Sequence, residues 1–253
     1  MKQYHVYISI MLSLMLMGML SCNKDPYHSP ASSQFTGSLV YNGNPIGVAN
    51  NGQGGSLAGK GNNSVYFQLT QPGYQLNAPI SVVVNQDGSF SDLLFNGNYK
   101  LTFPTGVYPF VLQSTDSIPV AINGATKMDI NVTPYYVFSN DAFKLSSPDS
   151  IVTATFSLSQ IITGANALPI NQVSLYISRT SFLDNNANAA AASISGSSIT
   201  NMNNLQLTLK VPSNLSTYGS NGAATQNYFY VRLGIQVGSL PQLLYSDIQK
   251  LSF

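Results

Sequence analysis

Strict alternation of apolar and polar side chains is the feature of this sequence that most constrains its fold. In segment 152–158, Val, Ala, Phe and Leu fall on one side of the chain while Thr and Ser fall on the other. Segments 127–132, 204–211 and 228–237 repeat this period of two, which is typical of half-buried β-strands. Asn-Gly and Asp-Gly pairs, which favour hairpin turns, lie between such segments. Only segment 185–195, with its run of alanines, offers a short helix, and its Asn and Ser residues weaken that helix. The sequence therefore predicts an all-β fold.

The N-terminus carries the pattern of a secretory signal peptide. Lys2 precedes an apolar stretch, residues 6–20, and the small residue Ser21 comes before Cys22. The stretch is shorter than the roughly 20 residues that a transmembrane helix needs, and its arrangement is that of a cleaved targeting segment. We therefore expect residues 1–21 to be removed. The alternative is a buried N-terminal helix or strand.

Cys22 is the only cysteine, so it cannot form an internal disulfide in an exported protein. Residues 18–22 resemble a bacterial lipobox, with Met19 where leucine is commonest. The resemblance implies that Cys22 is lipidated and anchors the protein to the outer membrane, where each buried acyl methylene contributes about 0.8 kcal/mol. Residues 23–25 resemble the short signal that sends Bacteroidetes lipoproteins to the cell surface; a plain polar spacer is the alternative. Residues 22–33, with two prolines, are expected to form a flexible tether.

The remaining chain is long enough for one large or two ordinary domains. A boundary is expected at Pro134, because proline interrupts the hydrogen-bond ladder of a sheet, so the strand after it should pair differently from the strand before it. We therefore assign residues 34–134 to a first β-sandwich and residues 135–253 to a second.

Three segments carry a resemblance to a known fold. Residues 37–46, 86–90 and 94–101 resemble a carboxypeptidase-regulatory-like, or transthyretin-like, sandwich, in which an Asp-Gly turn precedes a Phe and a Gly-x-Tyr closes the next hairpin. The second domain is similar to a fibronectin type III or immunoglobulin-like sandwich. With segments 132–136 and 245–247, the whole chain resembles an uncharacterised Bacteroidetes surface-lipoprotein family. Its members are typically encoded beside starch-utilisation-type outer-membrane transporters, which implies an accessory role in carbohydrate uptake.

The composition argues against several kinds of chemistry. The histidines are His5 and His28, both upstream of the expected domains, and the chain has no Glu. The domains therefore lack the residues for Ser-His-Asp or Cys-His catalysis and for zinc sites built on imidazole or thiolate. We expect no catalytic residues, no metal and no cofactor. A net charge of +1, with 8% charged residues, gives no reason to expect nucleic acid as a partner.

Aspartates are the side-chain carboxylates that a glycosidase would have to use, and such an enzyme needs two of them facing each other. Asp87 and Asp149 occupy turn-like positions, and Asp184 begins a fragment of a calcium loop that is better explained as a turn. Residues 54–61 approach a phosphate-binding loop, but Gly61 stands where Ser or Thr should hold magnesium. A surface loop explains that segment better.

Aromatic side chains provide the candidate binding residues. The alternation of side chains places Tyr176 on the polar side of one strand, and Tyr228, Tyr230 and Arg232 on the polar side of another. A fibronectin-like domain would place these two strands side by side. Such a face, if exposed, can stack on sugar rings or bind a protein partner. The alternative is that these side chains form cross-strand pairs that stabilise the sheet, or are covered by a neighbouring domain. Further candidates in loop-like stretches are Tyr74 and Tyr108.

Two serines lie in tripeptides that resemble the O-glycosylation acceptor of Bacteroidetes exported proteins. Ser117 and Ser150 both follow Asp and precede Ile, at expected junctions between a loop and a strand. We predict that both carry glycans in the native host.

Three functions fit these observations. The first is a non-catalytic outer-membrane lipoprotein that binds oligosaccharide, or the transporter complex, during carbohydrate uptake. The second is a structural or adhesive cell-surface module. The third, an aspartate-dependent glycosidase, would require a close buried pair of aspartates.

Overall fold

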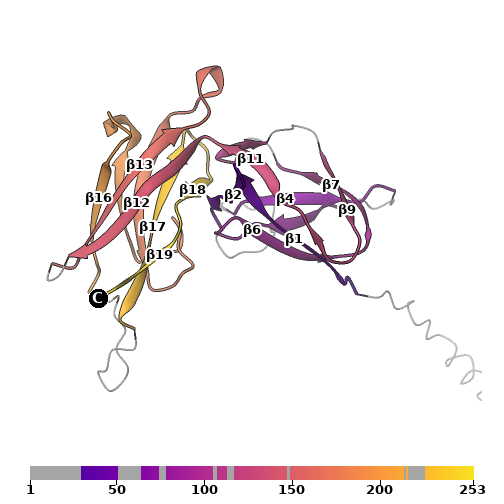
Figure 1. Ribbon diagram of the computed structural model, residues 1–253, viewed down its shortest axis with the longest axis horizontal. Coiled ribbons are helices and arrows are strands. Elements are labelled where there is room, and N and C mark those ends of the chain that lie inside the picture. The colour runs from indigo at the N-terminus through magenta and orange to yellow at the C-terminus, as the bar shows by residue number, and fades with distance from the viewer. Residues whose placement is uncertain are drawn as a thin grey trace, which may run out of the picture. The chain divides into compact units, whose positions relative to one another are not determined.

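The computed structural model describes residues 30–50, 64–73, 78–104, 107–112, 117–146, 149–213, 215 and 226–253. Within these ranges the fold is all-β, as predicted, and builds two β-sandwiches (Figure 1). Two single 3₁₀ turns, Gly164–Asn166 and Gly196–Ser198, interrupt the strands. The expected signal peptide, Cys22 and residues 54–61 lie outside the described residues.

The first sandwich is organised around β1 (Ser33–Tyr41). Its first sheet also contains β2 (Asn44–Pro45), β6 (Ser89–Leu94), β8 (Phe110–Leu112), β10 (Thr126–Lys127) and β11 (Ile130–Pro134). In it β1 runs antiparallel to β6 and parallel to β10 and β11. The second sheet is antiparallel, in the order β5 (Ile80–Val83), β4 (Tyr66–Thr70), β7 (Gly97–Thr102) and β9 (Ile118–Ile122).

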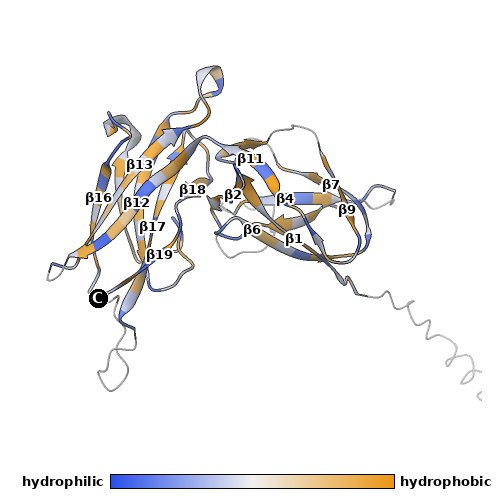
Figure 2. Cartoon of the chain, viewed as in Figure 1, coloured by the Kyte–Doolittle hydropathy of each residue, from blue (hydrophilic) through white to orange (hydrophobic). Residues whose placement is uncertain are grey.

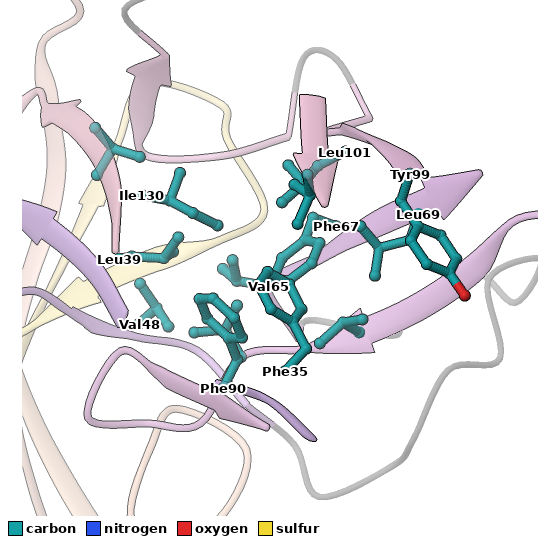
Figure 3. Close-up of a cluster of buried hydrophobic side chains, with 14 of the residues drawn as sticks. Phe35, Leu39, Val48, Val65, Phe67, Leu69, Phe90, Tyr99, Leu101 and Ile130 are labelled. Carbon is teal, nitrogen blue, oxygen red and sulfur yellow. The ribbon is translucent and has the colours of Figure 1, made fainter. Parts of the chain in front are cut away.

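Phenylalanine rings from both sheets meet in the core of this sandwich (Figure 3). The ring of Phe67 lies 4.9 Å from that of Phe90 and 6.4 Å from that of Phe35, both edge to face. Edge-to-face pairs of this kind contribute about 0.5–1.5 kcal/mol beyond the area they bury. The three rings therefore hold β1, β4 and β6 in a fixed arrangement.

The second sandwich has one three-stranded sheet, β12 (Tyr136–Ser146), β13 (Ile151–Gln160) and β16 (Leu205–Lys210). The facing sheet has the order β15 (Ala190–Ser195), β14 (Ile170–Ser178), β17 (Tyr228–Val237), β18 (Leu243–Tyr245) and β3 (Gly47–Val48), with β19 (Gln249–Ser252) also paired to β17. Strand β3 comes from the N-terminal part of the chain, so the two sandwiches share a hydrogen-bonded sheet.

The alternation in the sequence matches the burial of these strands. Along β17 every second residue from Phe229 to Val237 is fully buried, and four alternate residues of β13 from Val152 to Leu158 are buried as well. Hydrophobic and hydrophilic bands alternate along the strands of both sandwiches in Figure 2. The predicted change of partner at Pro134 is also confirmed, since β11 pairs with β8 and β1 whereas β12 pairs with β13.

Segment 185–195 differs from what its alanines suggest. Residues Ala190–Ser195 form β15, which pairs with β14 from Ile177↔Ala190 to Gln172↔Ser195. Alanine favours a helix only weakly over other residues, so pairing with a neighbouring strand outweighs that preference.

The hairpin between β1 and β2 uses the turn that its sequence predicts. Asn42 and Gly43 have φ values of 51° and 78°. Positive values at both central residues define a type I′ turn, whose twist matches that of the flanking strands. Asn and Gly are the residues that adopt it at least cost, so this turn is encoded locally.

Candidate functional site

The predicted exposed face of Tyr176 and Arg232 does not exist. The two residues are cross-strand neighbours, as parity predicted, but only 5% of Tyr176 and 2% of Arg232 is exposed. Parity fixes the side of the sheet on which a residue lies. It does not show that other parts of the chain cover this side of the sheet. They are the segment around Leu183 and the region of the first sandwich that carries Gln86.

Arg232 is bound by backbone carbonyls. Its Nε donates to the carbonyl of Ser246 at 2.9 Å, and its two terminal nitrogens donate to the carbonyls of Leu183 at 3.3 Å and Gln86 at 2.6 Å. The guanidinium also lies 4.5 Å from the centre of the Tyr245 ring. Burial lowers the pKa of Arg232 to about 10, so the side chain stays charged at neutral pH. Arg232 is therefore a structural residue that joins the two sandwiches.

Asp184 belongs to the same buried junction. Its Oδ1 accepts hydrogen bonds from the backbone N–H groups of Asn186 and Ala187, both at 2.8 Å, which makes the turn predicted for this segment. Its Oδ2 accepts a hydrogen bond from Nε2 of Gln86 at 3.1 Å. The Oε1 of Gln86 in turn accepts the backbone N–H of Leu183 at 2.9 Å. Gln86 thus fixes the start of the 184–188 loop from the first sandwich.

The other aromatic candidates are engaged in the fold. Tyr228 and Tyr230 are half-buried, their rings lie edge to face 5.7 Å apart, and Nζ of Lys250 lies 3.6 Å from the centre of the Tyr228 ring. Tyr108 is buried rather than in an open loop. Its hydroxyl donates to the carbonyl of Tyr66 at 2.7 Å, and its ring stacks on Phe110. Burial raises the pKa of Tyr108 far above its ordinary value. Tyr74 lies outside the described residues.

A polar groove of about 580 Å³ lies on the sheet formed by β14, β15 and β17, on the side away from the core. Its floor is β14, where the alternate residues Gln172, Ser174 and Tyr176 share one side, while Val173 and Leu175 point into the core. The lining residues are Gln172, Ser174, Tyr176, Asn185, Asn188, Ala191, Ser193, Gln236, Pro241 and Leu243. None of these carries a charge. We call this site the polar groove.

Hydrogen bonds hold the groove in shape and leave some of its polar atoms without a partner. Nε2 of Gln172 donates to the hydroxyls of Ser174 at 2.9 Å and Ser193 at 2.8 Å. Nδ2 of Asn188 donates to the carbonyls of Asp184 and Asn185, both at 3.1 Å. Within the described part of the chain, Oε1 of Gln172, Oδ1 of Asn188 and Nδ2 of Asn185 make no hydrogen bond. These two acceptors and one donor are available to a ligand.

A second groove of about 340 Å³ lies between the β1–β2 hairpin, β12 and the segment after β18. Tyr41, Asn44, Asp141 and Asp247 are among the residues that line it. It is smaller and offers carboxylates beside amides. We call it the hairpin groove.

Of the aspartates that the structure describes, Asp184 is fully buried, and both of its oxygens are bound within the fold as described above. The close buried pair that a glycosidase requires is therefore not seen in the described ranges. No cluster of three His, Cys, Asp or Glu side chains gathers in these ranges either. Among the same residues, no helix is long and apolar enough to span a bilayer.

The two candidate acceptor serines lie where the sequence placed them. Ser117 directly precedes β9, and Ser150 directly precedes β13 with a φ of 54°. Both are half-buried. Their glycosylation stays a prediction.

Sequence reasoning missed most of the polar groove. It singled out Tyr176 but none of the amides of Gln172, Asn185 and Asn188 beside it. The available signal was the excess of Asn, Gln and Ser over charged residues. That signal is spread over the whole chain and marks no particular place.

Comparison with known proteins gives one family. The model of a family described as protein of unknown function (DUF3823), N-terminal domain, matches residues 33–133. The model described as DUF3823_C, a domain of unknown function, matches residues 136–250. No curated protein matches the chain in sequence.

Solved structures are similar over most of the chain. A DUF3823 family protein from Bacteroides ovatus is 28% identical, with a TM-score of 0.71 over 87% of this chain and 99% of that one. A DUF3823 family protein from Parabacteroides merdae is 29% identical, with a TM-score of 0.70 over 88% of this chain and 100% of that one. A protein from Bacteroides uniformis, described as a candidate carbohydrate-binding protein, is 16% identical, with a TM-score of 0.64 over 89% of this chain and 100% of that one. At that identity the likeness concerns the fold alone.

Proposed function

The chain belongs to the DUF3823 family, and we propose that it is a non-catalytic, lipid-anchored outer-membrane protein that binds oligosaccharide in the polar groove. Its role is that of an accessory component in carbohydrate uptake.

The polar groove carries this proposal. Its volume of about 580 Å³ falls within the roughly 300–1,000 Å³ of ligand pockets. Amide and hydroxyl groups line it, and the unpaired acceptors of Gln172 and Asn188 match the hydroxyl donors of a sugar. Pro241 and Leu243 add apolar surface for the C–H faces of a sugar ring.

Two further observations support a role in carbohydrate uptake at the outer membrane. The structural neighbour from Bacteroides uniformis is described as a candidate carbohydrate-binding protein. The predicted signal peptide ends directly before the lone Cys22, which is where the acyl chains of an outer-membrane lipid anchor would be attached.

Glycan binding by the soluble chain from Asn23 onward tests the proposal. The chain is applied to an array of plant and host polysaccharides, and the affinity for each bound glycan is then measured by calorimetry. We expect Gln172→Ala to weaken binding about tenfold, or ~1.4 kcal/mol, because it removes an acceptor and the support of two serines. Gln206→Ala, on the exposed side of β16, is the matched control and should bind like the unmodified chain.

Two results would contradict the proposal. One is a chain that binds no glycan on the array. The other is a bound glycan whose affinity is the same in the Gln172→Ala and Gln206→Ala variants, which would place binding away from the polar groove.

A further inference from the structure

We infer that the polar groove selects uncharged saccharides and rejects those that carry carboxylate or sulfate groups. This inference rests on the proposed function and adds the class of ligand to it.

Two charged residues next to residues that line the groove are bound within the fold: Asp184, which precedes Asn185, and Arg232, which pairs with Tyr176. The carboxylate of Asp184 accepts two backbone N–H groups and the amide of Gln86. The guanidinium of Arg232 donates to three carbonyls and lies against the ring of Tyr245. Both side chains are buried, at 0% and 2% exposure. Neither is free to pair with a charged ligand in the groove.

A uronate or sulfate in the groove would lose water without gaining a cation. No side chain that lines the groove is basic. Transfer of an unpaired anion out of water is far more costly than transfer of a hydroxyl group that keeps a hydrogen bond. Anionic sugars are therefore at a disadvantage that a neutral sugar does not share.

The unpaired polar atoms fit hydroxyl groups instead. Oε1 of Gln172 and Oδ1 of Asn188 accept hydrogen bonds, and Nδ2 of Asn185 donates one. A sugar hydroxyl both donates and accepts, so it satisfies either kind of group. A carboxylate or sulfate oxygen only accepts, so it would leave the two acceptors facing it without partners and would repel them.

The 184–188 loop presents its amides in a fixed position. The hydroxyl of Tyr245 donates to Oδ1 of Asn185 at 2.8 Å and accepts the backbone N–H of Asn185 at 3.1 Å. These bonds hold the side-chain amide of Asn185 in place, while its Nδ2 makes no hydrogen bond within the described residues. A rigid donor lowers the ordering cost of binding and sharpens selection between ligands.

The test compares neutral and anionic glycans on the same protein. The soluble chain from Asn23 onward is titrated with neutral glucan, mannan, xylan and galactan, and with polygalacturonate, alginate and chondroitin sulfate. The best neutral ligand is also compared with its own carboxymethylated derivative. We expect binding to the neutral polymers only, at least tenfold weaker binding of the carboxymethylated form, and affinity unchanged between about 0.1 M and about 1 M salt.

Two variants localise the selectivity. Gln172→Lys should raise the affinity for the carboxymethylated polymer about tenfold relative to its neutral parent, because it places a cation in the groove. Gln206→Lys, outside the groove, should leave that ratio unchanged. The thermal midpoint of each variant shows whether it is folded.

Other outcomes separate the two proposals. Preferential binding of an anionic glycan, with an affinity that falls as salt rises, would overturn the neutral-sugar inference and leave glycan binding intact. The absence of binding to every polymer would overturn the proposed function and this inference with it. If Gln172→Lys and Gln206→Lys change the ratio of the affinities for the carboxymethylated and neutral polymers equally, the selectivity does not arise in the groove.

Discussion

Arg232 is the residue on which the junction between the sandwiches depends most. It satisfies three buried carbonyls, which belong to Leu183, Ser246 and Gln86. Buried ion or hydrogen-bond partners are costly to remove because the groups left behind lose both water and protein contacts. The stability of the whole chain should therefore respond to this one side chain.

We predict that Arg232→Met lowers the free energy of unfolding by roughly 3 kcal/mol, since it leaves the carbonyls of Leu183 and Ser246 without a donor and that of Gln86 with only the backbone N–H of Val48 at 3.3 Å. Urea denaturation measures this loss. Lys144→Met removes an exposed cation from β12 and should change stability by less than about 0.5 kcal/mol. Equal losses in the two variants would show that the carbonyl contacts contribute little.

At the level of single residues, the sequence predicts on which side of its strand a residue lies. It does not predict whether another part of the chain covers that side. Tyr176 and Arg232 lie on the side that parity assigned to them, next to each other. The segments that bury them carry Gln86, which is far from both in sequence, and Leu183, which is 49 residues from Arg232. Cover of this kind leaves no periodic signal, so the sequence left an exposed face and cover by a neighbouring domain as alternatives, and the structure shows the cover.

Strand β17 shows how an element depends on a small residue. A Cβ atom at Gly234 would lie 2.7 Å from Cε1 of Tyr245 and 2.9 Å from Cε2 of Tyr176. The two tyrosine rings, whose centres lie 6.2 Å apart, thus cross the strand over this glycine. Gly234 gives β17 the space that both rings need.

Gly234→Ala should lower the free energy of unfolding by about 1–3 kcal/mol, because both rings have to move. Because Tyr176 lines the polar groove, the same change should also weaken glycan binding. Thermal unfolding and calorimetry measure the two effects. Thr208→Ala, at an exposed position of β16, is the control that should alter neither. A Gly234→Ala variant of unchanged stability would refute the packing argument.

At the level of elements, the alternation of apolar and polar residues predicts the strands correctly, whereas the alanine content of segment 185–195 does not. The strands that alternate, such as β13 and β17, form where their pattern predicts because one face must be buried. The alanine-rich segment forms β15 instead of a helix, since its register with β14 decides its structure. Local propensity cannot show that a neighbouring strand will be present.

On the scale of the whole molecule, the first sandwich reaches the polar groove through Gln86. The Gln86 side chain bonds Asp184 and Leu183, and Asp184 shapes the loop that carries Asn185 and Asn188. The groove also collects residues from β14, β15 and the segment before β18. Its location follows from strand pairing across distant segments, which explains why the sequence did not reveal it. The resemblance to an uncharacterised Bacteroidetes family is confirmed as membership of the DUF3823 family. The lipoprotein character that the resemblance implies stays a prediction.

Gln86→Ala should therefore weaken glycan binding although it lies in the other sandwich. We expect a loss of about tenfold in affinity and about 1–3 kcal/mol in stability, because Asp184 loses a buried donor. Gln68→Ala, at a half-buried position of β4, is the matched control. If Gln86→Ala destabilises the chain yet binds glycan with unchanged affinity, the coupling between the first sandwich and the groove does not exist.

Attachment to the membrane is a separate property of the whole molecule. Cys22→Ala should abolish acylation and release the protein from membranes, because this lone cysteine follows the predicted signal peptide. Labelling with a fatty acid, followed by membrane fractionation, provides the measurement. An alanine variant that still incorporates label would show that the anchor lies elsewhere.

A crystal structure of the chain with a neutral oligosaccharide that it binds tests the central claim most directly. We predict that the sugar occupies the polar groove, with hydroxyl groups within hydrogen-bond distance of Oε1 of Gln172 and Oδ1 of Asn188. A sugar bound in the hairpin groove beside Tyr41 and Asp247, with the polar groove empty, would contradict it.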